Sequence, residues 1–418
     1  MTPPLRRGRI ACVLALLAAL LPAEGPPAAA APAAIAPVPE GITALLRDRG
    51  RAFEAKDRGL LQATLDPGSY AAAQLKAFDN ASQVAFSTFR VEPVTEFSGQ
   101  IAGERVKAKY SGREVAAFAV RQRSAVRGIE TEPYVDNGYY TFVKSGGGDY
   151  DGWRLASDSD FDVLGGFSPR QVWDFGPVEL ATSEHFAVLV HPDQSAKAAP
   201  ALAAAEKAYA SVKSFWPRPA TQRYLIVAPS TTGELDRILQ STIDLSKFVA
   251  FAARSIKTTE GLEPGGVRLF VQSSHFERYN DEGKQGILAH ELIHAVTTPA
   301  AGSFMPIWVE EGLATHGSSP KGSSLPTARR GGKPGTFPQD EQFSVGSVSD
   351  IGRAYAQSQV AFEVLSDRYS AEGVAKFYEA LGRTRIAAGS QEHHVAKALR
   401  ESVGWTVDEW TKAWQDRL

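Results

Sequence analysis

The residues with the clearest capacity for chemistry form the segment His290-Glu291-Leu292-Ile293-His294. Two histidines four positions apart lie on the same face of a helix, so both imidazoles can reach one metal ion. Glu291 is placed beside them to take a proton from a metal-bound water. If the histidines were merely surface residues of a helix, there would be no reason for a third ligand nearby. The pattern therefore predicts a metal site with a glutamate general base.

A third candidate ligand lies in residues 305–314, which have the sequence MPIWVEEGLA. This segment is typical of a helix with proline in its first turn. Glu310 or Glu311 could complete a His/His/Glu set, one of the standard ligand sets of a catalytic zinc site with an open fourth position. The single cysteine, Cys12, excludes a thiolate zinc site, an iron–sulfur site and a disulfide scaffold.

The two segments together resemble those of the gluzincin metallopeptidases. His-Glu-x-x-His followed by Trp-x-x-Glu-Gly-x-Ala is similar to the peptidase MA-like group of bacterial secreted or membrane-associated proteins. The resemblance extends from near Pro177 to the end of the chain. It implies one Zn²⁺ held by His290, His294 and Glu311, because in that group the metal-binding glutamate immediately precedes Gly-Leu-Ala. Glu310 lies about 100° further around the helix.

The resemblance also implies catalytic roles. Glu291 would accept a proton from the water and return it to the leaving amine. Tyrosine donates to the developing oxyanion in several gluzincins, and Tyr355 is the candidate here. Tyr355 could equally be a packing residue at the start of a helix. The sequence departs from the family at Thr315, where gluzincins often carry an acid that orients a metal-bound histidine. A threonine hydroxyl can accept that hydrogen bond only without charge assistance, so weaker metal affinity or activity is expected.

The elements that must position these residues predict an α+β fold with two domains. Residues 40–165 are predicted to form helices followed by an antiparallel meander with strands at 106–110, 114–122, 139–144 and 153–156. That order resembles the nuclear-transport-factor-like or cystatin-like folds. Residues 166–176, with Gly-Gly and Ser-Pro, are predicted as a linker.

Residues 177–418 are predicted as the metallopeptidase-like domain, with a mixed sheet lobe and a helical lobe. Strands are expected at 186–191, 224–228, 248–252 and 267–272, helices at 198–215 and 232–243, and mainly helix after Asp281. Residues 267–272 are expected to form an edge strand, either simply buried or able to pair with an extended peptide. The low-complexity residues 317–347 are predicted to be a flexible loop, by default disordered and alternatively a lid or self-processing site.

The first residues of the chain are typical of a targeting segment. Three arginines at positions 6, 7 and 9 precede an apolar run at 10–21 and an alanine- and proline-rich tract. Residues 1–36 are therefore interpreted as a secretory signal peptide and its Ala/Pro-rich continuation, predicting a secreted or extracytoplasmic (cell-envelope) protein. The alternative is an uncleaved N-terminal anchor, although the run is shorter than the about 20 residues of a membrane-spanning helix.

The composition agrees with a globular protein. Of the 418 residues 43% are hydrophobic and 22% charged, which argues against a fully disordered, collagenous or coiled-coil chain. A net charge of −2, with no basic stripe, gives no support for nucleic-acid binding. The sequence thus predicts an exported zinc-dependent metallopeptidase acting on a peptide or protein substrate. The alternatives are a catalytically silent envelope binding or scaffold protein that retains its zinc site, and a hydrolase of a non-peptide amide or ester.

Overall fold

The structure is a computed structural model, and it confirms the predicted α+β class. It describes residues 37–94, 102–165, 168–218, 220, 223–240, 244–256, 264–302, 305–383 and 391–418. The chain divides into two compact units. The N-terminal unit holds the described residues up to Leu180 together with Asp236–Gln240, and the C-terminal unit holds Ala181–Leu235 and Ser241–Leu418. The predicted signal segment, residues 1–36 with Cys12, lies outside the described residues.

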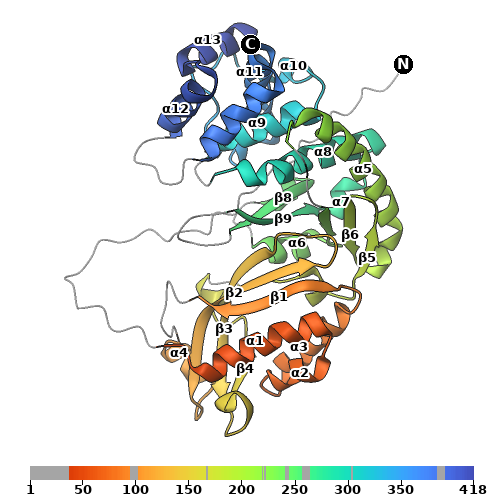
Figure 1. Ribbon diagram of the computed structural model, residues 1–418, viewed down its shortest axis with the longest axis vertical. Coiled ribbons are helices and arrows are strands. Elements are labelled where there is room, and N and C mark those ends of the chain that lie inside the picture. The colour runs from red at the N-terminus through yellow and green to blue at the C-terminus, as the bar shows by residue number, and fades with distance from the viewer. Residues whose placement is uncertain are drawn as a thin grey trace, which may run out of the picture. The chain divides into compact units, whose positions relative to one another are not determined.

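The N-terminal unit consists of helices followed by a four-stranded antiparallel sheet (Figure 1). The helices are α1 (Glu40–Ala55), α2 (Arg58–Ala63) and α3 (Ser69–Asn80). The strands pair in the order β1-β2-β3-β4, with β1 at Phe86–Pro93, β2 at Val115–Val126, β3 at Tyr134–Lys144 and β4 at Trp153–Ser157. Helix α1 buries Ile42, Leu45 and Leu46 completely, a spacing that places them on one helical face.

One predicted strand of this unit is wrong. Residues 106–110 fall largely in helix α4 (Glu104–Lys109), not in a strand. An ion pair of 3.0 Å joins Glu104 in its first turn to Lys107, and Lys107 and Lys109 lie in its last turn, an arrangement that suits the helix dipole. Strand β1 was not predicted, although Phe86, Phe89 and Val91 are buried in it.

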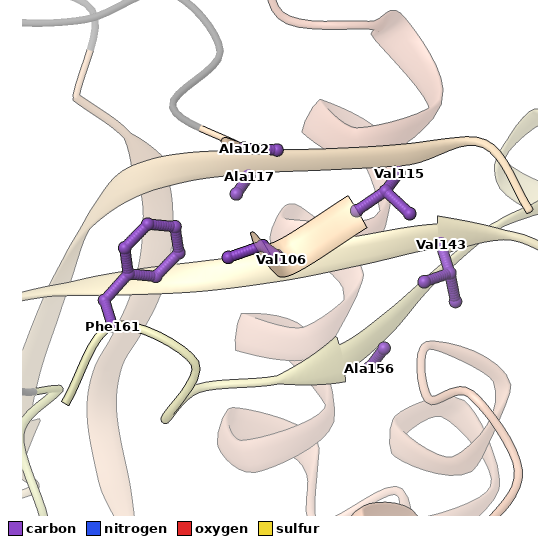
Figure 2. Packing of buried hydrophobic residues seen from close by; sticks show 7 residues of the cluster. All are labelled: Ala102, Val106, Val115, Ala117, Val143, Ala156 and Phe161. Atoms are coloured by element: carbon purple, nitrogen blue, oxygen red, sulfur yellow. The ribbon is translucent and has the colours of Figure 1, made fainter. Parts of the chain in front are cut away.

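Helix α4 packs against the sheet through one buried side chain, Val106. Figure 2 shows Val106 of α4 and Phe161 within a cluster of buried apolar side chains that also includes Ala102, Val115, Ala117, Val143 and Ala156. A helix fits here because a single apolar side chain, Val106, reaches the sheet while its charged neighbours face the solvent. Five residues of alternating pattern were too few to distinguish helix from strand.

Part of the predicted linker packs within the N-terminal unit. Trp173 is 4% exposed, and its ring centroid lies 5.6 Å from that of Phe86. The side-chain amide of Asn80 donates to the carbonyl of Trp173 over 2.9 Å. The short helix at Val172–Asp174 is therefore anchored to α3 and β1.

The C-terminal unit combines a mixed five-stranded sheet with a set of helices. The sheet order is β5-β6-β7-β9-β8, with β5 at Glu179–Thr182, β6 at Phe186–Val190, β7 at Tyr224–Ala228, β8 at Ala250–Ile256 and β9 at Pro264–Val271. Strands β6, β7 and β9 are parallel, and β8 is antiparallel to β9. The edge strand beside β9 is therefore β8, which corrects the expectation that residues 267–272 form the edge.

The helices of this unit are α5 (Ala198–Phe215), the first half of α6 (Thr232–Leu239), α7 (Ser273–Phe276), α8 (Asp281–Thr297), α9 (Ile307–Ser318), α10 (Leu325–Ala328), α11 (Val348–Gly382), α12 (Gln391–Val403) and α13 (Val407–Arg417). Helix α5 and strand β7 have the bounds expected from the sequence. Helix α9 packs against both α8 and α11.

A close approach between α9 and α11 depends on Gly312. A Cβ atom at this position would lie 2.7 Å from Cδ2 of Phe362 and 2.9 Å from the carbonyl oxygen of Ser358. Both distances are shorter than an ordinary contact, so only glycine lets the two helices pack this closely. The glycine of the EGLA segment thus has a packing role.

Helix α11 is interrupted at Ser370, which has φ 60° and ψ 178° in place of helical values. Its first part is held by α13, because the indole N–H groups of Trp410 and Trp414 donate to the carbonyls of Ala361 and Gln357, each over 2.9 Å. Both tryptophans are fully buried. The helix thus begins with a rigidly packed segment and continues after a break.

Residues 317–347 contain α10 and a short 3-10 helix at Asp340–Phe343. Phe337 is 8% exposed, and its ring stacks on Trp308 of α9 with a centroid distance of 4.4 Å. Phe343 is also buried and contacts the ring of Tyr355. The segment therefore has anchors in the core, and a lid or self-processing role for it stays a prediction.

Across the described residues, no helix is both long and apolar enough to cross a membrane.

Candidate metal centre

The two histidines and Glu311 converge as the sequence predicts. The Nε2 atoms of His290 and His294 lie 3.2 Å apart, and Oε2 of Glu311 lies 3.1 Å from the first and 3.7 Å from the second. All three ligand atoms fall within 4.8 Å of one another. Two imidazole nitrogens and one carboxylate oxygen at this separation can hold a metal ion.

Helix α8 positions the two histidines. Its N-terminus is capped by Asn280, whose side chain accepts the backbone N–H of Gly283 over 2.9 Å, and Asp281 and Glu282 occupy its first turn. Residues 287–295 are all buried, so the middle of the helix runs through the core. The histidines are consequently held between packed apolar neighbours, with little freedom to leave the site.

Helix α9 places Glu311 and Glu310 in different surroundings. Glu311 faces the histidines and is fully buried. Glu310 turns toward β8, where Oε1 lies 3.0 Å from Nη1 of Arg254. The geometry therefore brings Glu311 to the two histidines, whereas Glu310 forms an ion pair away from the ligand atoms.

The negative charge of buried Glu311 is stabilised by its contacts with the two histidines. Burial by itself would raise the pKa of Glu311, but hydrogen bonds from His290 and His294 outweigh that effect and lower the pKa to about 2. Burial lowers the pKa of His294, against the opposing influence of Glu311. Glu311 is therefore ionised and the site offers a negative charge to a cation.

Glu291 is fully buried, and within the described part of the chain neither of its carboxylate oxygens has a hydrogen-bond partner. Burial, and next the charge of Glu311, raise its pKa well above the usual value, while the backbone of Ala252 in β8 acts in the opposite direction. An unpaired buried carboxylate is costly, and such a group is expected where a ligand or water is bound.

No known family model matches this chain, nor does any curated protein.

Tyr355 lies beside the metal-ligand candidates. It is fully buried in α11, and its ring centroid is 6.1 Å from that of His290. The same ring packs edge-on against Phe343 at 5.2 Å. Its position suits both the packing and the catalytic interpretation.

The expected role of Thr315 has no support. Its hydroxyl is buried, and no hydrogen-bond partner for it occurs among the described residues, so it does not accept from either histidine. One residue further on, burial lowers the pKa of His316 to about 4. Its ring lies against Phe215, 5.4 Å between centroids, and not at the ligand cluster.

Two groups near the site were not anticipated from the sequence. Arg254 pairs with Glu310, and Tyr378 interacts electrostatically with Glu310, Arg254 and Glu311. The hydroxyl of Tyr378 donates to Thr297 over 3.4 Å. Each comes from an element distant in sequence, β8 or the second part of α11, and neither carries a local motif that could have identified it.

The remaining histidines do not form a second site. In the described ranges, His290, His294 and Glu311 are the only group of three or more potential ligands close enough to share a metal ion. His185 instead interacts with Glu206 over 2.7 Å and stacks on Tyr209.

Proposed function

We propose that the C-terminal unit is a zinc-dependent metallopeptidase. The observation that carries this proposal is the convergence of His290, His294 and Glu311 within 4.8 Å next to the unpaired carboxylate of Glu291. Two imidazoles and a carboxylate form a common catalytic zinc set, and the orphaned buried oxygens of Glu291 fit a site that binds a further group. The resemblance of HELIH and WVEEGLA to the gluzincins supports the same conclusion.

When bound, zinc supplies Lewis acidity and lowers the pKa of water. The chain supplies the proton acceptor, because Glu291 directly follows His290 and no side chain of the described residues is hydrogen-bonded to its carboxylate. Its raised pKa favours holding a proton, and its ionisation becomes easier once the adjacent charge of Glu311 is compensated by a cation. Glu291 then accepts a proton and later passes it to the leaving amine.

A peptide substrate is supported by the edge strand. Strand β8 ends the sheet, and its Ala252 lies close to Glu291. An extended peptide can pair with such an edge through main-chain hydrogen bonds. The substrate carbonyl would then lie near Glu291, with Tyr355 as the candidate donor to the developing oxyanion. An exported location follows from the targeting pattern of residues 1–36.

The proposal is tested by metal analysis of the purified protein and by a peptide-library cleavage assay. Wild type should contain one zinc ion per chain and cleave peptides. Glu291→Gln should retain the zinc and lose activity by about 10²–10⁴-fold, the usual contribution of general base catalysis. Glu282→Gln, an exposed carboxylate of the same helix, is the matched control and should keep wild-type activity.

Three other results would change the conclusion. Stoichiometric zinc without cleavage of any peptide, amide or ester would favour the scaffold alternative. Cleavage of small amides or esters but no peptide would favour a non-peptide hydrolase. Full peptidase activity in Glu291→Gln would disprove the assigned role of Glu291.

A further inference from the structure

The N-terminal unit contains a buried arginine whose hydrogen-bonding capacity is mostly unused. Arg49 of α1 is 4% exposed, and its Nη2 donates to Oε1 of Gln74. Its Nε and Nη1 have no hydrogen-bond partner in the described part of the chain. Guanidinium is always charged and carries five N–H donors, so leaving several unpaired away from water is costly. Buried donors of this kind normally have a partner.

A second unused donor lies in the same cluster. The hydroxyl of Tyr70, at the start of α3, is buried and likewise unpartnered among the described residues. Tyr70 and Arg49 interact electrostatically, and both interact with Asp158 and Tyr140. Arg49 and Tyr70 thus present free donors within one region of the unit.

The nearby carboxylates do not satisfy these donors, because they have other partners. Oδ2 of Asp158 accepts from Nη1 of Arg170 over 2.7 Å and from the amide of Gln74 over 3.4 Å. Oδ2 of Asp174 accepts the backbone N–H of Gln171 over 2.7 Å. Arg49 also has a hydrogen bond with Tyr140, but its Nε and Nη1 and the Tyr70 hydroxyl stay unpaired among the described residues, so we infer that their acceptor comes from outside the chain.

We propose that the N-terminal unit binds a small carboxylate through the free donors of Arg49 and Tyr70. A single negative charge suits the site, because Asp158 and Asp174 nearby disfavour a doubly charged anion. The aromatic rings of Phe53 and Tyr140 lie 5.8 Å and 5.9 Å from the Arg49 guanidinium carbon. The body of the ligand is therefore expected to be apolar, and aromatic or short aliphatic acids fit this description.

The ligand is expected to approach from the side of α3. Tyr70 and Gln74 are one helical turn apart and only partly buried, although the Tyr70 hydroxyl itself is inside. Movement of these two side chains would give a ligand a route from solvent to Arg49. The ligand would replace the missing partners of the buried guanidinium and stabilise the folded unit.

Calorimetric titration of the full-length protein with benzoate tests the proposal. Benzamide has the same shape without the charge, and inorganic phosphate carries more charge without the apolar body. Benzoate should bind saturably with one site per chain, and both comparison compounds should bind at least about tenfold more weakly. Tyr70→Phe should weaken benzoate by about threefold or more, and Arg49→Met should abolish binding.

Arg47→Met, an exposed arginine of the same helix, is the matched control and should leave binding unchanged. Circular dichroism establishes whether Arg49→Met is folded. If it is not, the affinity of Tyr70→Phe for benzoate and the comparison of benzoate with benzamide still test the proposed site. The absence of saturable benzoate binding, equal affinity for benzamide, tighter binding of phosphate, or wild-type affinity in a folded Arg49→Met would each overturn the proposal.

Discussion

The guanidinium of Arg254 lies 3.0 Å from the carboxylate of Glu310, the residue that immediately precedes Glu311. Both side chains are largely buried, with 17% and 6% of their surfaces exposed. The pair connects β8, whose Ala252 lies near Glu291, with α9, which holds Glu311. It therefore couples the position of the edge strand to that of the ligand helix.

Breaking this pair should destabilise the fold. Arg254→Met leaves Glu310 buried without its partner, and we expect a loss of about 2–4 kcal/mol, slightly below the value for a fully buried pair. Urea unfolding measures the change. The double variant Arg254→Met with Glu310→Gln should regain most of the loss, since no unpaired charge remains. An additive effect of the two substitutions would show that they do not interact.

The choice between the two adjacent glutamates is tested by metal content. Glu311→Gln removes a charged oxygen from the ligand cluster and should lower the bound metal well below one ion per chain. Glu310→Gln is the matched control at the neighbouring position and should retain the metal, because its carboxylate faces Arg254. The opposite pattern, with metal lost only in Glu310→Gln, would contradict the assignment.

Substitution of Gly312 should separate the two helices that it brings together. In Gly312→Ala the new Cβ meets Phe362 and the carbonyl of Ser358, so we expect destabilisation of about 1–3 kcal/mol. Gly352→Ala is the control, because a Cβ at Gly352 has no heavy atom within 4 Å and alanine favours a helix. That control should be neutral or slightly stabilising in the same unfolding assay, and equal effects at both positions would refute the packing argument.

Tyr355 offers a test of transition-state stabilisation. Its ring lies next to His290, and we expect Tyr355→Phe to lower kcat by about 10²-fold while KM and metal content stay near wild type. Tyr378→Phe is an informative comparison, since its hydroxyl donates to Thr297. An unchanged kcat in Tyr355→Phe would leave Tyr355 with a packing role only.

Asp174 should make the stability of the N-terminal unit depend on pH. Desolvation by its neighbours raises the pKa of its carboxyl to about 6, above the value of about 4 in an unfolded chain, although the residue is open to solvent on one side. Its contribution to stability is therefore full below pH about 4 and is lost as the pH rises through about 6. Because Asp174 is exposed, solvent screening reduces the effect, and wild type is expected to lose about 1 kcal/mol relative to Asp174→Asn over this range.

Unfolding free energies of the two proteins at several pH values measure that difference. Asp79→Asn alters an exposed aspartate of α3, 52% exposed, and should follow wild type. A constant difference between Asp174→Asn and wild type from pH 4 to 7 would contradict the expectation.

The group of residues that could hold a metal ion was predictable because its members obey local rules. His290 and His294 are one helical turn apart, and Glu311 belongs to a segment with a distinctive pattern. The structure brings these three together with Glu291 and Tyr355. The surroundings were not predictable, since Arg254 and Tyr378 reach the site through the packing of distant elements, and Thr315 lacks the expected hydrogen bond.

The fold likewise has elements that the sequence predicts and elements that it does not. Long segments with clear periodicity, such as α5 and β7, have the bounds expected from the sequence. The short segment at 106–110 forms a helix because tertiary packing of Val106 decides its conformation. The edge position of β8 depends on the order of the strands, which alternation within a single strand does not encode.

The interruption of α11 at Ser370 has a mechanical consequence for the site. Because the backbone angles of Ser370 are not helical, α11 (Val348–Gly382) consists of two helical segments that meet at this residue. Tyr355 belongs to the first helical segment and Tyr378 to the second. Local unfolding of one segment does not have to spread to the other. Each tyrosine can therefore serve as a probe for the unfolding of its own segment. Two tyrosines near the candidate metal site thus belong to separate helical segments.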